Sequence, residues 1–398
     1  MTPPPLPVIR LKPKANARAI RHGAPWVYDN ELVTDRRTRA LAAGTVALLE
    51  DADRAPLALV AVNPGSRIMA RVLEREVTAQ IGPDWLRGRL VAALALRTRA
   101  YDTPFYRLAH AEGDGLPGVV IDRFGDIAVI QPNAAWAERL LPEIADTLQE
   151  VTGVATVLKN AGGRARALEG LDSANAVLAG AWPEGPVEVA MTGARYLADV
   201  TGGQKTGLYY DQRPNHGFAA RLARGAHVLD VFAHVGGFSL AALAAGAATA
   251  LAVDSSAPAL DLARQGAARS GVADRFEARQ GDAFETLAEL GREGAQFDLV
   301  ICDPPAFAPS KQALEAGLRA YERVARLAAP LVAPGGILGL CSCSHAADLA
   351  RFRTASIRGI GRAGRTGPLI HTGFAGPDHP QHPHLAETAY LKALFFRL

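Results

Sequence analysis

The sequence has 398 residues, of which 49% are hydrophobic, 21% charged and 6% aromatic, and its formal net charge is +3. This composition excludes an intrinsically disordered chain and is typical of a globular protein with two or three domains and a sizeable core. Three cysteines are too few for a disulfide framework, which favours a reducing, cytoplasmic location.

The N-terminal stretch is basic and has no apolar leader. Its opening, MTPPPLPVIRLKPK, places prolines and charges where a signal peptide has an apolar run, and no later apolar run reaches the ~20 residues of a membrane span. A local basic patch suits a polyanion such as RNA. The abundance of arginine throughout the chain explains the same excess equally well. Against three acids, residues 1–40 hold Arg10, Lys12, Lys14, Arg18, Arg21, Arg36, Arg37 and Arg39.

Residues 1–75 predict a small β-rich domain, because short β-branched runs (VIRL, GTVALLE, LALVAVN) alternate with turn residues. In the opening, basic residues directly precede the aromatic pair Trp26 and Tyr28. This opening resembles the start of a PUA domain, a small RNA-binding β-barrel found at the front of one family of RNA methyltransferases. A plain β-barrel without a ligand is the alternative.

Residues 76–190 predict a central α+β domain. The stretch WLRGRLVAALALRTRAY has helical periodicity, and GVVIDRF and IAVIQP form a hairpin that turns at Gly125–Asp126. A helix (AAWAERLLPEIADTLQEV) and a strand (ATVLKN) follow. No catalytic constellation stands out in this domain.

Residues 191–398 predict an α/β domain, because apolar strands alternate with helices as in a parallel, Rossmann-like sheet. The Pro/His-rich stretch GPDHPQHPHL is expected to be a loop. The expected strands are HVLDVF, TALAVD, RFEARQG, FDLVICD, GILGLCSC and the closing ETAYLKALFFRL.

The first of these strands leads into a glycine turn and a helix, HVLDVFAHVGGFSLAALAAGA. Such a turn lets the backbone approach a ligand and aims a helix N-terminus at it. The G-x-G-x-x-G pattern is absent, since only Gly236–Gly237 are present, and this lowers the case for NAD.

Acidic residues end three successive predicted strands beside this turn. Asp254 is placed to bind both ribose hydroxyls, Asp282 to accept from an adenine amino group, and Asp230 to meet a cationic amino group. S-adenosylmethionine (SAM) has that amino group and NAD lacks it. Each acid alone is more often a turn former or a helix cap, but the three together favour SAM. The predicted cofactor-binding residues are Asp230, Phe232, Gly236, Gly237, Phe238, Asp254, Ser255, Asp282 and Ala283.

The fourth strand ends in FDLVICDPPAFAPSK, where an acid is held by two prolines at a position that binds ligands in open α/β sheets. The set DVFAHVGGFS, AVDSS, GDAF, DPPAFAPSK and SCS (342–344) resembles the bacterial class I SAM-dependent ribosomal RNA methyltransferases of the RlmI type. The pre-core stretch GQKTGLYYDQR (203–213) and the ending DHP…YLK (378–392) match the same family.

This resemblance implies synthesis of 5-methylcytosine in large-subunit (23S) ribosomal RNA, with Cys343 as nucleophile and Asp303 as the acid that holds the cytosine. It also implies a homodimer. Many related enzymes carry a second cysteine after the proline of the fourth-strand motif, but here Ala306 follows Pro305. Product release therefore cannot use a cysteine at that position. Four residues match the pre-core motif without individual roles: Lys205, Asp211, Gln212 and Arg213.

The two cysteines of GLCSCSH have different expected roles. On a strand, Cys341 and Cys343 face the same side but differ in depth by roughly 6.6 Å. Ligands lie beyond the carboxyl ends of the strands, which favours Cys343 as the reactive thiol and Cys341 as a buried filler. A zinc site with His345 does not have the usual spacing, and no metal is predicted.

Two other functions remain open. Methylation of a guanine or an exocyclic nitrogen needs no cysteine, and Asp-Pro-Pro-aromatic motifs occur in such enzymes. A catalytically inactive RNA-binding protein with a SAM fold would have lost the strand-end acids, all of which are present.

Overall fold

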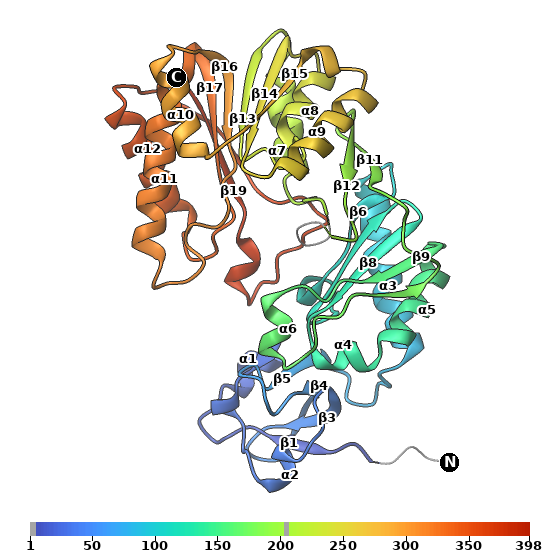
Figure 1. Cartoon of the computed structure of the whole chain (residues 1–398). Helices are drawn as coiled ribbons and strands as arrows, with labels where there is room; N and C mark the ends of the chain where they lie inside the picture. Colours follow the sequence, from blue (N-terminus) through green and yellow to red (C-terminus); the bar gives the residue numbers. More distant parts are fainter. Residues whose placement is uncertain (1–4, 203–206) are drawn as a thin grey trace. The chain divides into compact units, whose positions relative to one another are not determined.

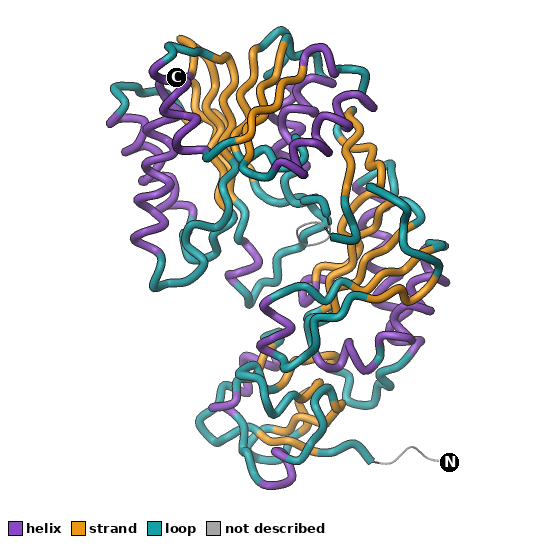
Figure 2. Tube along the Cα trace, in the orientation of Figure 1, coloured by secondary structure: helices purple, strands orange, loops and turns teal. Residues whose placement is uncertain are grey.

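The computed structural model describes residues 5–202 and 207–398. The chain forms two compact units, the first comprising residues 5–184 and 377–385, and the second residues 185–202, 207–376 and 386–398. Figure 1 labels their helices and strands, and Figure 2 separates helix from strand by colour. The chain therefore passes from the second unit back to the first for nine residues near its end.

The N-terminal part of the first unit is a five-stranded sheet in the order β1-β3-β4-β5-β2, as predicted from its short β-branched runs. Alternate residues such as Ile9, Ala47 and Leu49 point into a closed apolar core. Its elements are β1 (Val8–Arg10), α1 (Ala17–Arg21), β2 (Trp26–Val27), α2 (Arg36–Arg39), β3 (Thr45–Glu50), β4 (Pro56–Val62) and β5 (Ala70–Glu74).

A second five-stranded sheet, β10-β9-β8-β7-β6, forms the rest of the first unit. The predicted hairpin is confirmed, with Phe124 opposite Ile127 and Gly125 at φ 67°. The helix expected over 134–151 is instead two helices, because Pro142 lacks the N–H that would continue the first. The elements are α3 (Pro83–Ala100), β6 (Phe105–His110), β7 (Val119–Phe124), β8 (Ile127–Pro132), α4 (Ala135–Arg139), α5 (Leu141–Thr152), β9 (Thr156–Lys159), α6 (Arg164–Leu168) and β10 (Ala176–Ala179).

The loop predicted at 376–385 is confirmed as irregular, and its residues 377–385 are built into the first unit. The carboxylate of Asp378 is fully buried and accepts hydrogen bonds from the Tyr101 hydroxyl (2.9 Å) and the Arg107 amide (3.2 Å). The guanidinium of Arg97 donates to the Asp378 carbonyl (2.9 Å) and to Asp114. Since a buried charge is retained only when it is well paired, these contacts explain the buried acid of the DHP motif.

The second unit begins with an antiparallel hairpin and then forms a seven-stranded sheet in the order β15-β14-β13-β16-β17-β19-β18. The α/β class is confirmed, and β13 to β17 run parallel. The strand β19 is antiparallel to both of its neighbours, and β18 was not predicted. The strands are β11 (Val187–Met191), β12 (Ala194–Ala198), β13 (His227–Val231), β14 (Thr249–Asp254), β15 (Phe276–Gln280), β16 (Phe297–Cys302), β17 (Val332–Ser342), β18 (Leu369–Gly373) and β19 (Lys392–Arg397).

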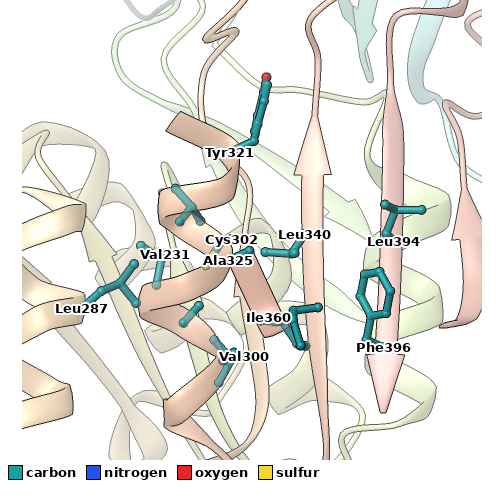
Figure 3. Packing of buried hydrophobic residues seen from close by; sticks show 14 of the residues in the cluster. Val231, Leu287, Val300, Cys302, Tyr321, Ala325, Leu340, Ile360, Leu394 and Phe396 are labelled. Carbon is teal, nitrogen blue, oxygen red and sulfur yellow. The ribbon is translucent and has the colours of Figure 1, made fainter. Parts of the chain in front are cut away.

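Helices cover both faces of this sheet, with α7, α8 and α9 on one face and α10, α11 and α12 on the other (Figure 1). The core on the second face packs Val300 and Leu340 of the strands against Ala325 of α11 and Ile360 of α12 (Figure 3). No helix in the described part of the chain is long and apolar enough to cross a membrane. The helices are α7 (Arg213–Arg221), α8 (Gly237–Ala244), α9 (Ala257–Arg269), α10 (Ala283–Arg292), α11 (Leu314–Ala328) and α12 (Leu349–Arg362).

Candidate active site

Four acids lie along one edge of the large sheet. Asp230 is the penultimate residue of β13, Asp254 is the last residue of β14, and Asp282 and Asp303 follow β15 and β16 closely. These four strands are parallel neighbours, so their carboxyl ends meet at this edge. The structure therefore brings the strand-end acids together where open α/β sheets bind ligands.

The turn between β13 and α8 has an unusual backbone. Phe232 (φ 65°), His234 (φ 50°) and Gly236 (φ 80°) all lie in the left-handed region, which non-glycine residues seldom adopt. A Cβ atom added at Gly237 would lie 2.7 Å from Nε2 of His216, so this position has no room for a side chain. Such strain is concentrated at ligand-binding segments.

Asp230 has one oxygen available at this turn. Its side chain is buried; one oxygen accepts from the Ser239 amide at 2.8 Å, and the other has no hydrogen-bond partner among the described residues. Burial raises the pKa of Asp230 to about 6, and the nearby charge of Asp254 also raises it. A buried carboxylate with an available oxygen is suited to an ammonium group, as the sequence predicts for SAM.

Asp254 and Asp282 also organise the backbone. The two oxygens of Asp254 accept from the amides of His234 and Ser256, each at 2.8 Å, and each oxygen keeps a lone pair for a ribose hydroxyl. Asp282 is the N-cap of α10, where one of its oxygens accepts from the amides of Phe284 and Glu285. Within the described part of the chain, its other oxygen accepts no hydrogen bond and is available to a ligand. The two neighbours predicted with these acids differ in exposure, Ser255 being exposed and Ala283 buried.

An aromatic group lies beside these acids. Phe232, Phe284 and Phe307 have ring centroids 6.0–6.5 Å apart, and the Arg323 guanidinium lies 4.5 Å from the Phe284 ring. Flat apolar surfaces of this kind are suited to a nucleobase such as adenine. The predicted Phe238 is not part of this group, because it is buried under the turn with its ring 4.5 Å from that of His216.

The three cysteines differ sharply in exposure. Cys302 and Cys341 are buried, and burial raises the pKa of both thiols. Cys343 follows the last residue of β17 and is partly exposed, with its Sγ 4.0 Å from the carbonyl of Pro304. The predicted strand GILGLCSC thus ends one residue early, so that Cys343 lies on the turn beside the Asp-Pro-Pro loop.

A buried hydroxyl network holds this turn. The Tyr321 hydroxyl of α11 lies 2.9 Å from Oγ of Ser342 and 2.7 Å from Oγ of Ser344, and the amide of Ala308 donates to Ser344 (2.9 Å). Figure 3 shows the Tyr321 hydroxyl pointing away from the aliphatic core. The two serines on either side of Cys343 are therefore fixed to the segment that follows Asp303-Pro304-Pro305.

The pre-core motif meets the end of the chain in the same unit. Asp211 accepts a hydrogen bond from the Tyr390 hydroxyl at 2.7 Å, and the Arg213 guanidinium lies 5.4 Å from the Tyr210 ring. The side chain of Gln212 accepts from Asn215 and lies beside Cys341. Lys205 lies outside the described residues.

Sequence reasoning missed several residues at this edge. Tyr209 interacts electrostatically with Asp211, Cys343, Asp303 and Asp254, and burial raises its pKa to about 12. Tyr209 and Lys392 stand in the motifs GLYYDQR and YLK, but the family resemblance gives neither of them a role. Phe284 and Phe307 stand in the stretches GDAF and DPPAF, which the sequence singles out for their acids, whereas Tyr321 has no local sequence signal.

Known proteins resemble this chain over both of its domains. A family model described as S-adenosylmethionine-dependent methyltransferase matches residues 137–397, and one described as a PUA-like domain matches residues 9–75. The chain is 35% identical over 405 residues to a ribosomal RNA large subunit methyltransferase of Deinococcus radiodurans, covering 98% of both chains. It is 33% identical over 394 residues to ribosomal RNA large subunit methyltransferase I of Shewanella denitrificans, covering 98% of this chain and 99% of the relative.

Solved structures share the fold over the whole chain. A SAM-dependent methyltransferase from Streptococcus mutans has a TM-score of 0.81 at 16% identity, and a methyltransferase crystallised with SAH has a TM-score of 0.83 at 17% identity. Each comparison covers 99% of this chain and 100% of the other. With an N-terminal PUA-like domain and a C-terminal SAM-dependent domain, the chain belongs to the large-subunit ribosomal RNA methyltransferase I family.

Proposed function

We propose that this protein makes 5-methylcytosine in large-subunit ribosomal RNA through a covalent adduct with Cys343. The observation that carries the proposal is the position of Cys343, the partly exposed cysteine, on a turn beside the Asp-Pro-Pro loop. The relatives are named as methyltransferases of the same RNA.

The chemistry explains why a thiol is needed. Carbon 5 of cytosine is a weak nucleophile, but addition of a thiolate to carbon 6 gives it enamine character, which is covalent catalysis. Carbon 5 then takes the methyl group, a base removes the proton from carbon 5, and the carbon–sulfur bond breaks to restore the ring and the thiolate. Asp303 holds the cytosine and, as the protonated acid, donates a hydrogen bond to ring N3, where negative charge develops on addition.

The cofactor SAM supplies an electrophilic methyl group at this edge of the sheet. We propose that Asp230 binds its amino group, Asp254 its ribose hydroxyls, and Asp282 with Phe232 and Phe284 its adenine. The available oxygen of buried Asp230 supports this assignment.

The PUA-like domain is proposed to hold the RNA. Arg10 and Arg21 form ion pairs with Glu50 and Asp51. The three arginines of α2 (Arg36–Arg39) are exposed, and no ion pair involves them within the described residues. They are therefore the better candidates for contacts with phosphates.

The test compares Cys343→Ala with Cys341→Ala, a matched control that removes a thiol two residues away. Nucleoside mass spectrometry of ribosomal RNA from a deletion strain complemented with each variant identifies the product. RNA carrying 5-fluorocytosine traps the adduct, because fluorine cannot leave as the C5 proton does. Cys343→Ala should lose both product and adduct while still binding SAM, and Cys341→Ala should retain both. Full activity in Cys343→Ala would contradict the adduct and indicate methylation of a nitrogen.

A further inference from the structure

A buried lysine lies beneath the turn that carries Cys343. Lys392 is the first residue of β19 and is paired with Ser342 of β17 in antiparallel register. Its side chain is buried, and Nζ donates to the carbonyls of Ser344 and Ala347, each at 2.7 Å. One ammonium group therefore holds both ends of the segment that follows Cys343.

The hydrogen bonds of Lys392 go to neutral acceptors, so they leave the charge of its ammonium group without a counter-charge from these partners. An ammonium has three donors, and two of those of Lys392 go to neutral carbonyls. Burial lowers the pKa of Lys392 to about 8, while Cys343 and then Asp348 act electrostatically in the opposite direction. A buried cation of this kind is stabilised by an anion nearby.

Other described residues also interact electrostatically with Cys343 or with its neighbours. Cys343 interacts electrostatically with the hydroxyls of Tyr209 and Tyr321, and the carboxylate of Asp303 acts on the same Tyr209 hydroxyl. The other titratable group on the turn, His345, is exposed. Electrostatic interaction is mutual, so the charge of Lys392 stabilises the thiolate of Cys343 as the thiolate stabilises the lysine.

We propose that Lys392 is a positioning residue for Cys343, holding its turn through two carbonyls and stabilising its thiolate with the ammonium charge. At neutral pH, below the Lys392 pKa of about 8, the lysine keeps its proton while the thiol loses its own to solvent. The inference rests on the proposed function for the role of Cys343, but ionisation of the thiol can be measured without RNA or methyl transfer.

The experiment measures the rate of alkylation of Cys343 by iodoacetamide in the full-length protein between pH 5 and 9.5. Cys302 and Cys341 are buried, and Cys343→Ala establishes the background. Lys392→Met should move the midpoint of the rate profile up by about one pH unit or more, so that alkylation at pH 7 slows roughly tenfold. Lys392→Arg keeps the charge, so it should move the midpoint less than Lys392→Met does.

Arg365 offers a matched control, because it also bridges two carbonyls, those of Ala329 and Val332, near the start of β17. Arg365→Met should leave the alkylation profile unchanged. If Lys392→Met leaves the midpoint where it is in a folded protein that binds SAM, Lys392 only supports the loop and the proposal is wrong.

A second measurement covers the case in which Lys392→Met does not fold. In the wild-type protein with ¹³C-labelled lysine, the Lys392 resonance should titrate at lower pH after Cys343 is blocked as a methyl disulfide. An unchanged titration overturns the proposal. Neither readout depends on whether the product is 5-methylcytosine, so failure of the proposed function would be seen separately, in the product and trapping assays.

Discussion

The edge of the large sheet has two halves that are built by different means. In the cofactor half, over β13 to β15, carboxylates accept hydrogen bonds from backbone amides a few residues away or on the turn after the neighbouring strand. In the cysteine half, over β16 to β19, hydroxyls and one ammonium group join segments far apart in sequence, such as Ala308, Tyr321, Ser344 and Lys392. The first half is organised locally and the second only by the tertiary fold.

The difference fits what each half must do. The cofactor half has to present acceptors and a close backbone to a ligand that binds and leaves, which strand-end acids and a glycine turn achieve. Under the proposed function, the cysteine half has to keep a thiol within reach of the cytosine while the adduct forms and breaks, and the side-chain network around the turn would fix that geometry. The two halves should therefore respond differently to mutation.

The largest effect is expected in the cofactor half from Asp254→Ala. The variant loses the acceptors for two ribose hydroxyls and for the hydrogen bond from the His234 amide. SAM binding should therefore weaken by about 1.5–3 kcal/mol, or roughly 10- to 150-fold. Isothermal titration calorimetry measures the change. Asp261→Ala, an exposed acid on the neighbouring helix α9, is the control and should bind SAM as the wild type does. Unchanged affinity in folded Asp254→Ala would remove Asp254 from the site.

This half was accessible from the sequence because its signals are local. A β-strand followed directly by an acid, as in LAVDSS and QGDAF, is visible in a few residues, and parallel neighbours bring such acids to one edge. The role of helix cap, which the sequence offers as the alternative for each acid, applies to Asp282. The burial of Phe238 was not visible, because it depends on how α8 packs on the sheet.

The cysteine half was accessible only in part. Placing Cys343 nearer the edge than Cys341 follows from the direction of one strand, and the structure has this order of exposure. The contacts of Tyr321 and Lys392 with the turn require the packing of α11 and the antiparallel return of β19, and no short-range pattern encodes either. The same reason applies to residues 377–385, whose DHP motif is buried in the first unit although it stands late in the chain.

Tyr321→Phe tests whether the hydroxyl network acts on the chemistry or only on stability. Removing the hydroxyl leaves the buried hydroxyl of Ser342 without its acceptor, so the free energy of unfolding should fall by about 1–3 kcal/mol in urea denaturation. Single-turnover methyl transfer should also slow while SAM affinity stays the same. The control is Tyr106→Phe, a buried tyrosine of the first unit, which should lose only stability. A wild-type transfer rate in folded Tyr321→Phe would show that the network serves packing alone.

A pH series separates the two halves further. The pKa of Asp230 is about 6, raised by burial, and an ammonium ligand would favour the ionised form. Below pH 6 the free protein therefore holds a proton that must leave on SAM binding, so affinity falls as pH falls. At pH 5 it should be about tenfold weaker than at pH 8.

Asp230→Asn is the control for this series. The amide cannot ionise, so SAM should bind it more weakly, and the decrease in affinity between pH 8 and pH 5 should disappear. The same decrease in wild type and Asp230→Asn would assign the pH dependence to another group. Calorimetry in two buffers of different ionisation enthalpy also measures the proton released.

The smallest effect is expected from the PUA-like domain, outside both halves. Replacing Arg36, Arg37 and Arg39 by glutamine removes three exposed cations, and the slope of log affinity against log salt should fall by about 0.7 to 0.9 for each phosphate that is no longer neutralised. Filter binding of a ribosomal RNA fragment across a salt series gives this slope, and SAM affinity and thiol alkylation should not change. The matched variant replaces three exposed arginines of α11 and α12, Arg326, Arg353 and Arg358. If both variants reduce the slope equally, RNA is held by charge spread over the surface rather than by the PUA-like domain. A reduction confined to the α2 variant would assign RNA holding to a region separate from the two halves that bind SAM and present the thiol.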